Sequence, residues 1–106
     1  MITILNEQKG ENELFVLSDG KDKLAECEYS FVKAEILEIN AFCENSDVFC
    51  ESVLRAALSR LDFSGKTDVI SKNPNLCEFL TKIGFEYKDG VGIINTTEFF
   101  KKSNCK

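Results

Sequence analysis

Apolar and polar residues alternate over much of residues 1–42, which is the pattern of half-buried β-strands. The alternation is clearest in residues 23–32, where Ala25, Cys27 and Tyr29 are separated by glutamates. Lys33 is expected to turn the chain into a further strand at residues 35–42. The whole segment predicts strands at residues 1–5, 13–17, 23–32 and 35–42, a loop at residues 6–12, and a tight turn at Asp19-Gly20. We expect the last three strands to form an antiparallel meander.

From Asp47 the pattern changes to the three- and four-residue spacing of a helix with one apolar face. The apolar face comprises Cys50, Val53, Leu54, Ala57, Leu58 and Leu61. Ser46 or Asp47 can cap the start, and Ser64-Gly65 ends the helix. Residues 66–71 then predict a short strand, and a strand, helix and strand in this order imply a right-handed crossover.

Asn73-Pro74 begins a second helix, with Asn as the cap and Pro at the first helical position. Gly84 is the expected stop. Residues 85–87, Asp89-Gly90 and residues 91–99 predict a closing β-hairpin, and the lysines that follow are expected to be a solvated end. The fold class predicted is α/β, with a mixed, mostly antiparallel sheet and two main helices in a single domain over residues 1–106.

Composition excludes several kinds of function. The 106 residues carry 13 basic and 18 acidic side chains, a net charge of −5, and no clustered basic face for nucleic acid. No apolar run is long enough to span a membrane, and the short apolar start lacks the basic region of a signal peptide, so a cytoplasmic protein is expected. Five cysteines without any histidine or C-x-x-C spacing give no zinc motif, so no metal site is predicted.

The second half of the chain resembles the GNAT N-acetyltransferases. The resemblance lies in the order of the elements and in the stretch Asn73-Pro74-Asn75-Leu76-Cys77-Glu78-Phe79-Leu80-Thr81-Lys82-Ile83-Gly84-Phe85, which matches the family's Asn, amphipathic helix and closing Lys-x-Gly-Phe. It implies that the parallel strands flanking the first helix splay apart and form a groove beside the positive end of that helix. Acetyl-CoA is the cofactor that the resemblance implies.

The phosphate-binding loop of the family departs from its pattern here. GNAT proteins carry Q/R-x-x-G-x-G/A, whose backbone N–H groups hold the pyrophosphate, but Val48 and Cys50 stand at the two glycine positions. Asp47 adds a negative charge, or serves simply as the helix cap. The cofactor contacts that the resemblance implies are Ile39, Ala41, Asn45, Ser46, Asp47, Val48, Phe49, Cys50, Glu51 and Asn73.

Catalytic residues are sparse in this chain. Leu80 stands where many GNAT enzymes have a tyrosine that protonates the leaving thiolate. Glu38 and Glu35 are the candidate bases, since a strand carboxylate is the base in some GNAT enzymes, and Glu38 is the catalytic candidate chosen. The ordinary role of such a side chain is that of a solvent-facing strand residue. Cys43 and Cys50 lack an activating base.

Three functions stay open at this stage. The first is a reduced GNAT-like N-acetyltransferase that acts on a small-molecule or protein amine. The second is a non-catalytic module derived from the family that binds an acyl-CoA or a protein. The third is a dimerisation scaffold, because residues 1–12 leave no room for the family's first two helices, and a sheet face left uncovered would favour a homodimer.

Overall fold

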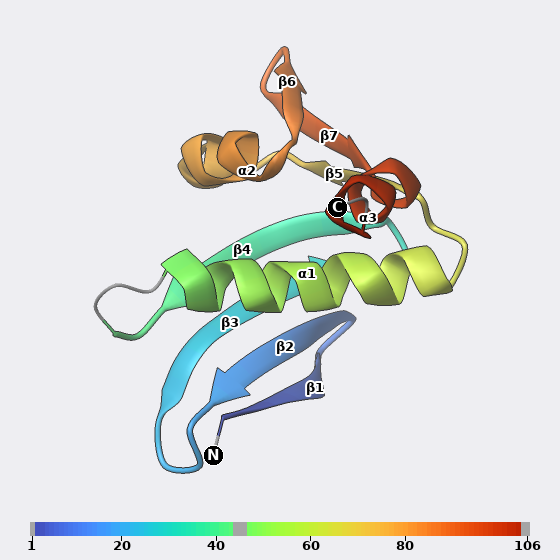
Figure 1. Ribbon diagram of the computed structural model, residues 1–106. Coiled ribbons are helices and arrows are strands. Elements are labelled where there is room, and N and C mark those ends of the chain that lie inside the picture. Colours follow the sequence, from blue (N-terminus) through green and yellow to red (C-terminus); the bar gives the residue numbers. More distant parts are fainter. Residues whose placement is uncertain (1, 44–46, 105–106) are drawn as a thin grey trace.

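The computed structural model describes residues 2–43 and 47–104, with side chains described as far as residue 101 (Figure 1). The elements are β1 Thr3–Lys9, β2 Asn12–Ser18, β3 Lys23–Ser30, β4 Glu35–Ala41, α1 Asp47–Phe63, β5 Asp68–Ser71, the 3-10 turn η1 Pro74–Leu76, α2 Cys77–Ile83, β6 Glu86–Lys88, β7 Val91–Asn95 and α3 Thr96–Asn104. The seven strands form one sheet in the order β1-β2-β3-β4-β5-β7-β6. Its neighbours are antiparallel except for β4 and β5, which confirms the predicted mixed, mostly antiparallel sheet.

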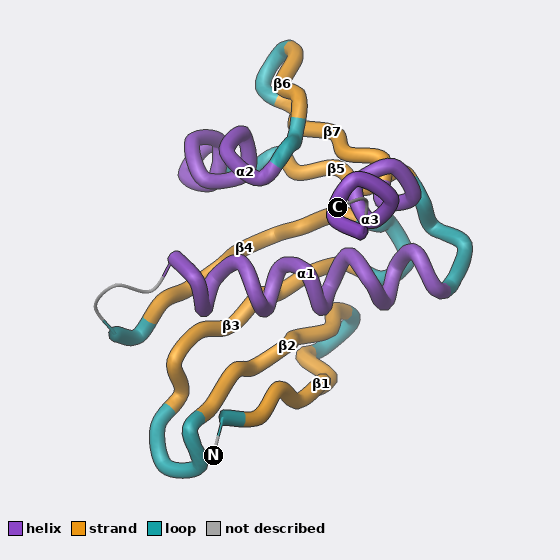
Figure 2. The backbone as a smooth tube through the Cα atoms, viewed as in Figure 1, coloured by secondary structure: helices purple, strands orange, loops and turns teal. Residues whose placement is uncertain are grey.

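The structure confirms the predicted span of α1 and its buried face. Val53, Leu54, Ala57, Leu58 and Leu61 are all fully buried. The helix runs along β3 and β4 in Figures 1 and 2, and its buried residues belong to one core cluster with those of β3, β5, α2 and β7. The shared cluster puts α1 and α2 on the same face of the sheet.

An ion pair with a tyrosine beside it fastens the end of α1 to the meander. The Arg60 Nε lies 2.6 Å from the Glu13 Oε1, and the Tyr29 hydroxyl donates to the same oxygen over 2.6 Å. The Arg60 guanidinium holds the pKa of the Glu13 carboxyl below its usual range, against the opposing effect of burial. These contacts fix where α1 lies along β2 and β3.

The prediction of a loop at residues 6–12 was wrong for residues 6–9, which belong to β1, and for Asn12, which begins β2. Strand β1 continues to Lys9 and pairs with β2 over its whole length, and Gly10 turns the chain with a φ of +60°. All seven residues of β1 are exposed, because it is an edge strand at the end of the sheet. Polar residues are therefore tolerated on both of its faces, and alternation gives no signal there.

The prediction of a strand over residues 91–99 was right for residues 91–95 and wrong for residues 96–99, where a third helix joins the two that were predicted. Strand β7 ends at Asn95, and a third helix, α3, follows directly. The Asn95 side-chain oxygen accepts a bond from the Glu98 backbone N–H over 2.9 Å, as a helix cap does. The buried Thr96 hydroxyl donates to the Asp62 carboxylate of α1 over 2.8 Å, so a tertiary contact overrides the strand preference of two adjacent threonines.

We expect Thr96→Val to lower the free energy of unfolding by about 1–2 kcal/mol, because it removes the donor that the fully buried Thr96 offers to the half-buried Asp62 carboxylate. Urea unfolding followed by circular dichroism measures the change. Thr97→Val is the matched control, since Thr97 is exposed and reaches the same carboxylate over a longer 3.3 Å. Equal effects of the two substitutions would contradict this account of α3.

Candidate functional site

Strands β4 and β5 part after a single pair of residues. Glu35 lies opposite Ile70, and the Ile70 N–H donates to the Ala34 carbonyl over 3.0 Å. The register between β3 and β4 then shifts, because Glu28 faces Glu38 whereas Tyr29 faces Ile36. Leu37 is thus an extra residue in β4, and such a bulge bends its strand. Beyond the bulge β4 and β5 diverge, as the resemblance implied, and the V-shaped separation between the two strands is called the gap.

Two side chains from the end of β5 bridge the apex of this gap. The Ser71 hydroxyl donates to the Ile36 carbonyl over 3.0 Å, and the Asn73 Nδ2 donates to the Leu37 carbonyl over 2.9 Å. The Asn73 Oδ1 also accepts from the Asn75 backbone N–H over 2.9 Å, which confirms Asn73 as a cap. Its carboxamide therefore both starts the second helical segment and ties that segment to β4.

Beyond the apex, the backbone of β4 has an unpaired edge. The Phe42 N–H donates to the Leu24 carbonyl, so by alternation the backbone groups of Asn40 and Glu38 also face β3. The backbone groups of Ile39 and Ala41 then face the gap, where no strand of the described residues pairs with them. An extended ligand with amide groups could bond to this edge as an added strand does.

Five of the ten predicted cofactor contacts, residues 47–51, lie at the start of α1. Asn45 and Ser46 lie outside the described residues. Asp47 and Val48 are exposed, and Phe49 and Cys50 are half-buried. Glu51 pairs with the Arg55 Nε over 2.9 Å.

The charges of the first turn of α1 oppose the binding of a pyrophosphate. The helix end offers backbone N–H groups to an anion, but Asp47 and Glu51 place two carboxylates beside them. Arg55 is the nearest basic side chain along the helix, and it also stacks over the Phe99 ring at 5.1 Å from the centroid. The turn therefore attracts an anion less strongly than a neutral loop would.

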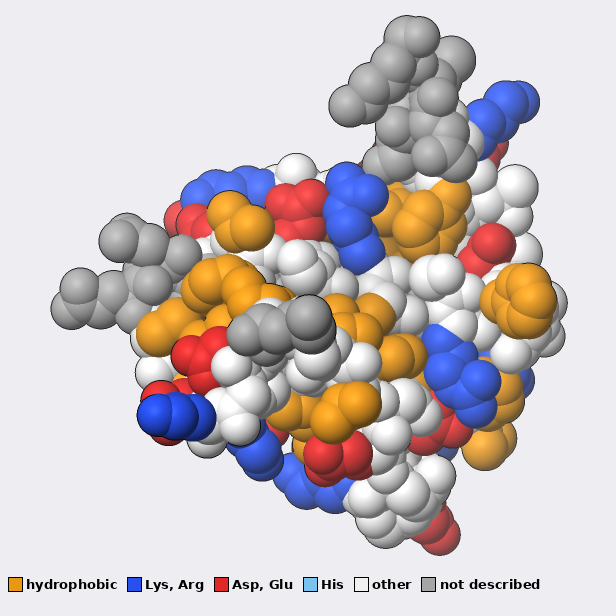
Figure 3. Space-filling model, turned by 60° about the horizontal axis from the view of Figure 1, so that its bottom comes forward, with side chains coloured by type: hydrophobic (Ala, Val, Ile, Leu, Met, Phe, Trp, Pro, Cys, Tyr) orange, Lys and Arg blue, Asp and Glu red, His pale blue; other side chains and the backbone are white. Residues whose placement is uncertain are grey.

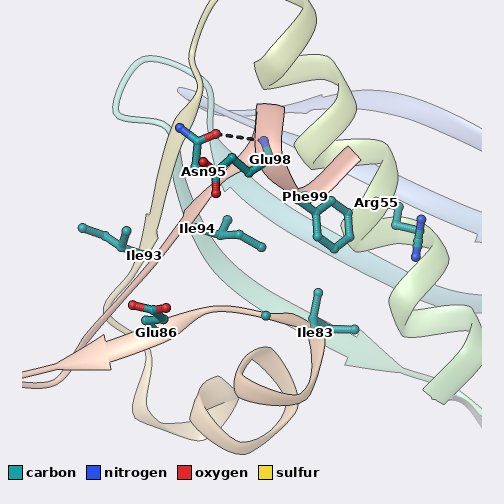
Figure 4. A pocket seen from close by; sticks show the side chains of 9 residues that line it. Arg55, Ile83, Glu86, Ile93, Ile94, Asn95, Glu98 and Phe99 are labelled. Carbon is teal, nitrogen blue, oxygen red and sulfur yellow. Dashed lines mark hydrogen bonds between the residues drawn. The ribbon is translucent and has the colours of Figure 1, made fainter. Parts of the chain in front are cut away.

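A cavity of about 520 Å³ lies between α1, the end of α2, β7 and α3 (Figure 4). Figure 4 shows Ile83, Ile94 and Phe99 around this space, with Arg55 on the α1 side. The lining residues are Arg55, Ile83, Gly84, Glu86, Ile93, Ile94, Asn95, Glu98 and Phe99. Sequence analysis missed this cavity because part of its wall comes from α3, which was expected to be a strand and a tail.

A second cavity, of about 590 Å³, lies at the turns that join β1 to β2 and β3 to β4. It is lined by Glu11, Asn12, Ser30, Val32, Lys33, Glu35 and Leu37. Two of its lining residues are carboxylates and one is a lysine, and Leu37 is the bulged residue of β4. The cavity therefore reaches the apex of the gap, where β4 and β5 part.

The catalytic candidate Glu38 is exposed and lies opposite Glu28 on β3, away from the helix-covered face. Lys9 pairs with Glu28 over 3.1 Å, and the two carboxylates Glu28 and Glu38 help to raise the pKa of Lys9. Because Ile39 follows Glu38 in the strand, their side chains point to opposite faces of the sheet. Leu80, which the resemblance aligned with the family's tyrosine, is fully buried in the core.

No family model and no curated protein matches the sequence. Among solved structures, the chain is similar to the crystal structure of the ribosomal-protein-S18-alanine N-acetyltransferase from Escherichia coli, with a TM-score of 0.62 and 14% identity. The alignment covers 84% of this chain and 72% of that one. The fold is GNAT-like.

At this level of identity, the likeness extends to the GNAT-like fold alone. Within the described part of the chain, no helix is long and apolar enough to cross a membrane. In the same residues, no group of three or more cysteine and carboxylate side chains is arranged to hold a metal ion.

Proposed function

We propose that this protein binds acetyl-CoA in the gap between β4 and β5 and transfers the acetyl group to an amine. The observation that carries the proposal is the parting of two parallel strands after one residue pair, in a GNAT-like fold, beside the first turn of α1.

The described residues fit the pantetheine arm of acetyl-CoA better than they fit its pyrophosphate. The free backbone edge at Ile39 and Ala41 suits the two amides of the pantetheine arm. The pyrophosphate would meet the first turn of α1, where the helix end attracts it and Asp47 repels it. Asn73 borders the same gap, with its oxygen committed to the cap. We therefore expect weak binding.

In this proposal the acceptor amine reacts on the face of the sheet that the helices leave uncovered, where Glu38 lies. Bound acetyl-CoA would supply a thioester: the amine nitrogen would bond to its carbonyl carbon, and the carbon–sulfur bond would break to release coenzyme A as the thiol. Glu38 would accept the proton that the amine loses. Since the gap separates β4 from β5, an amine that approaches from the uncovered face meets Glu38 first. The carboxylates of Glu11 and Glu35 in the adjoining cavity suit a cationic acceptor, whether a small molecule or a protein amine.

The second candidate function is a binding module without catalysis. The buried Leu80 favours it, because this side chain cannot donate a proton to a leaving thiolate. Val48 and Cys50 favour the binding module as well. Each adds a Cβ where the family has a glycine, and this weakens the contacts with phosphate.

A homodimer accompanies either function in this proposal. Strand β1 is an unpaired edge with Ile4 39% and Leu5 56% exposed, and hydrophobic side chains lie in several exposed groups among charged ones in Figure 3. We expect light scattering to give a dimer mass for the wild type and a monomer mass for Leu5→Glu. A monomer at high concentration in both would contradict the dimer.

Acetyl-CoA at millimolar concentration should raise the melting temperature, because a ligand above its Kd stabilises the folded state. Asp47→Asn should tighten binding several-fold, since it removes a repulsion of about 1 kcal/mol while keeping a side chain that can cap the helix. Asp89→Asn, in the β6–β7 turn, is the control for net charge. The absence of any shift for the wild type and for Asp47→Asn would reject both acetyl-CoA functions.

Release of free thiol from acetyl-CoA with a panel of amines separates the enzyme from the module. If Glu38 is the base, Glu38→Gln should lower the turnover rate about 100-fold and leave acetyl-CoA binding unchanged. Glu7→Gln is the control, because Glu7 is an exposed carboxylate on the edge strand. If the wild type binds acetyl-CoA measurably but releases no thiol, the non-catalytic binding module is the function that remains.

A further inference from the structure

The second cavity, at the turns β1–β2 and β3–β4, is lined by charged side chains of both signs that do not pair with one another. Lys33 is basic, and Glu11 and Glu35 are acidic. The ion pairs of the described residues join other side chains, and none of them includes these three. The described part of the chain therefore leaves one ammonium group and two carboxylates at this cavity without an ion-pair partner.

The second cavity lies on the face of the sheet that the helices leave uncovered. Ser30 of β3 faces Glu35 of β4. Their neighbours Tyr29 and Ile36 are fully buried in the core cluster that includes α1. Neighbouring side chains of a strand point to opposite faces, so Ser30 and Glu35 point away from the helices. The two turns that contribute to the cavity lie at the same end of the meander in Figure 1.

A buried hydroxyl in the wall of this cavity has a proton to donate. Ser30 is 7% exposed, and its Oγ accepts a hydrogen bond from the Lys33 backbone N–H over 3.1 Å. A serine hydroxyl can also donate one hydrogen bond, and none of the described residues accepts one from Ser30. Buried donors ordinarily find an acceptor. The Ser30 hydroxyl and the Lys33 ammonium group are therefore both available to an anionic group in the cavity.

A ligand in this cavity meets both charges and an apolar surface. The volume of about 590 Å³ falls within the range of about 300–1,000 Å³ that is typical of small-molecule sites. Lys33 and Ser30 suit a carboxylate, and Glu11 and Glu35 suit an ammonium group. Leu37 adds apolar surface. A simple cation or a simple anion would leave one of the two sets of charges without a partner.

We propose that the second cavity binds a small zwitterion of dipeptide size, whose carboxylate lies at Lys33 and whose ammonium group lies at Glu35. The nitrogen of this ligand is then the amine of the proposed acetyl transfer, and this part of the inference rests on the proposed function. Glu35 and Glu38 both belong to β4 and point to the uncovered face, so the nitrogen lies toward the candidate base. The ammonium group loses one proton to solvent before it reacts, and the proton lost on attack goes to Glu38.

Isothermal titration calorimetry without acetyl-CoA tests the site. The probe is leucyl-leucine, whose apolar side chains suit the Leu37 part of the wall. Two analogues each lack one charge: leucyl-leucinamide has no carboxylate, and N-acetyl-leucyl-leucine has no ammonium group. We expect the wild type to bind leucyl-leucine about tenfold more tightly than either analogue, the effect of one charge-assisted hydrogen bond.

Two substitutions assign the charges of the probe to residues. Lys33→Gln should lower the affinity for leucyl-leucine about tenfold and leave the affinity for leucyl-leucinamide unchanged, because the amide has no carboxylate. Glu35→Gln should lower the affinity for leucyl-leucine by a similar factor and leave that for N-acetyl-leucyl-leucine unchanged. The matched controls are Lys88→Gln in β6 and Glu78→Gln in α2, since both residues are exposed and neither lines the cavity.

Two binding results would overturn the proposal. One is equal affinity of the wild type for the three compounds, which includes the absence of binding. The other is an equal effect of Lys33→Gln on leucyl-leucine and on its amide. If leucyl-leucine binds as expected and acetyl-CoA does not bind, the zwitterion site is supported and the proposed function is rejected.

Thiol release tests the role of the ligand as acceptor. If acetyl-CoA binds, release should be about tenfold faster with leucyl-leucine than with leucyl-leucinamide at concentrations below the Kd of either compound. Equal rates would reject the zwitterion as the acceptor and leave the proposed function standing.

Discussion

The arrangement of the candidate site depends on the short backbone pairing between β4 and β5. A parallel pair of strands ordinarily continues its ladder of backbone bonds, but here the ladder stops after Glu35 and Ile70. The bulge at Leu37 turns β4 away, and the carbonyls that lose their ladder partners are satisfied by Ser71 and Asn73. Side chains thus replace backbone bonds at the apex, and the edge beyond it stays open for another partner.

Helix α1 joins the two parts of the sheet that the gap separates. It packs on the meander through its five buried apolar residues and the Arg60–Glu13 pair. It also contacts the second part through α3, where Thr96 bonds to Asp62, and the buried residues of both parts form one core cluster. Because α1 holds both parts, β4 and β5 need not pair along their length to keep the fold together.

The sequence was most informative where one helix face is buried and least informative where tertiary contacts decide. The spacing from Cys50 to Leu61 gave α1 and its buried residues, and Asn73 was identified as a cap because capping is local. Residues 6–9 were missed because an edge strand has no buried face to impose alternation. Helix α3 was missed because its start depends on Asp62, which is remote in the chain.

The candidate site was the hardest part to predict, because the sheet and not the spacing along the chain decides which residues meet there. The Ser71 and Asn73 side chains reach carbonyls of β4 from the end of β5. Tyr87, Gly92 and Ser71 lie in one row across three strands. These neighbours follow from the register of the strands, which the local sequence pattern does not contain.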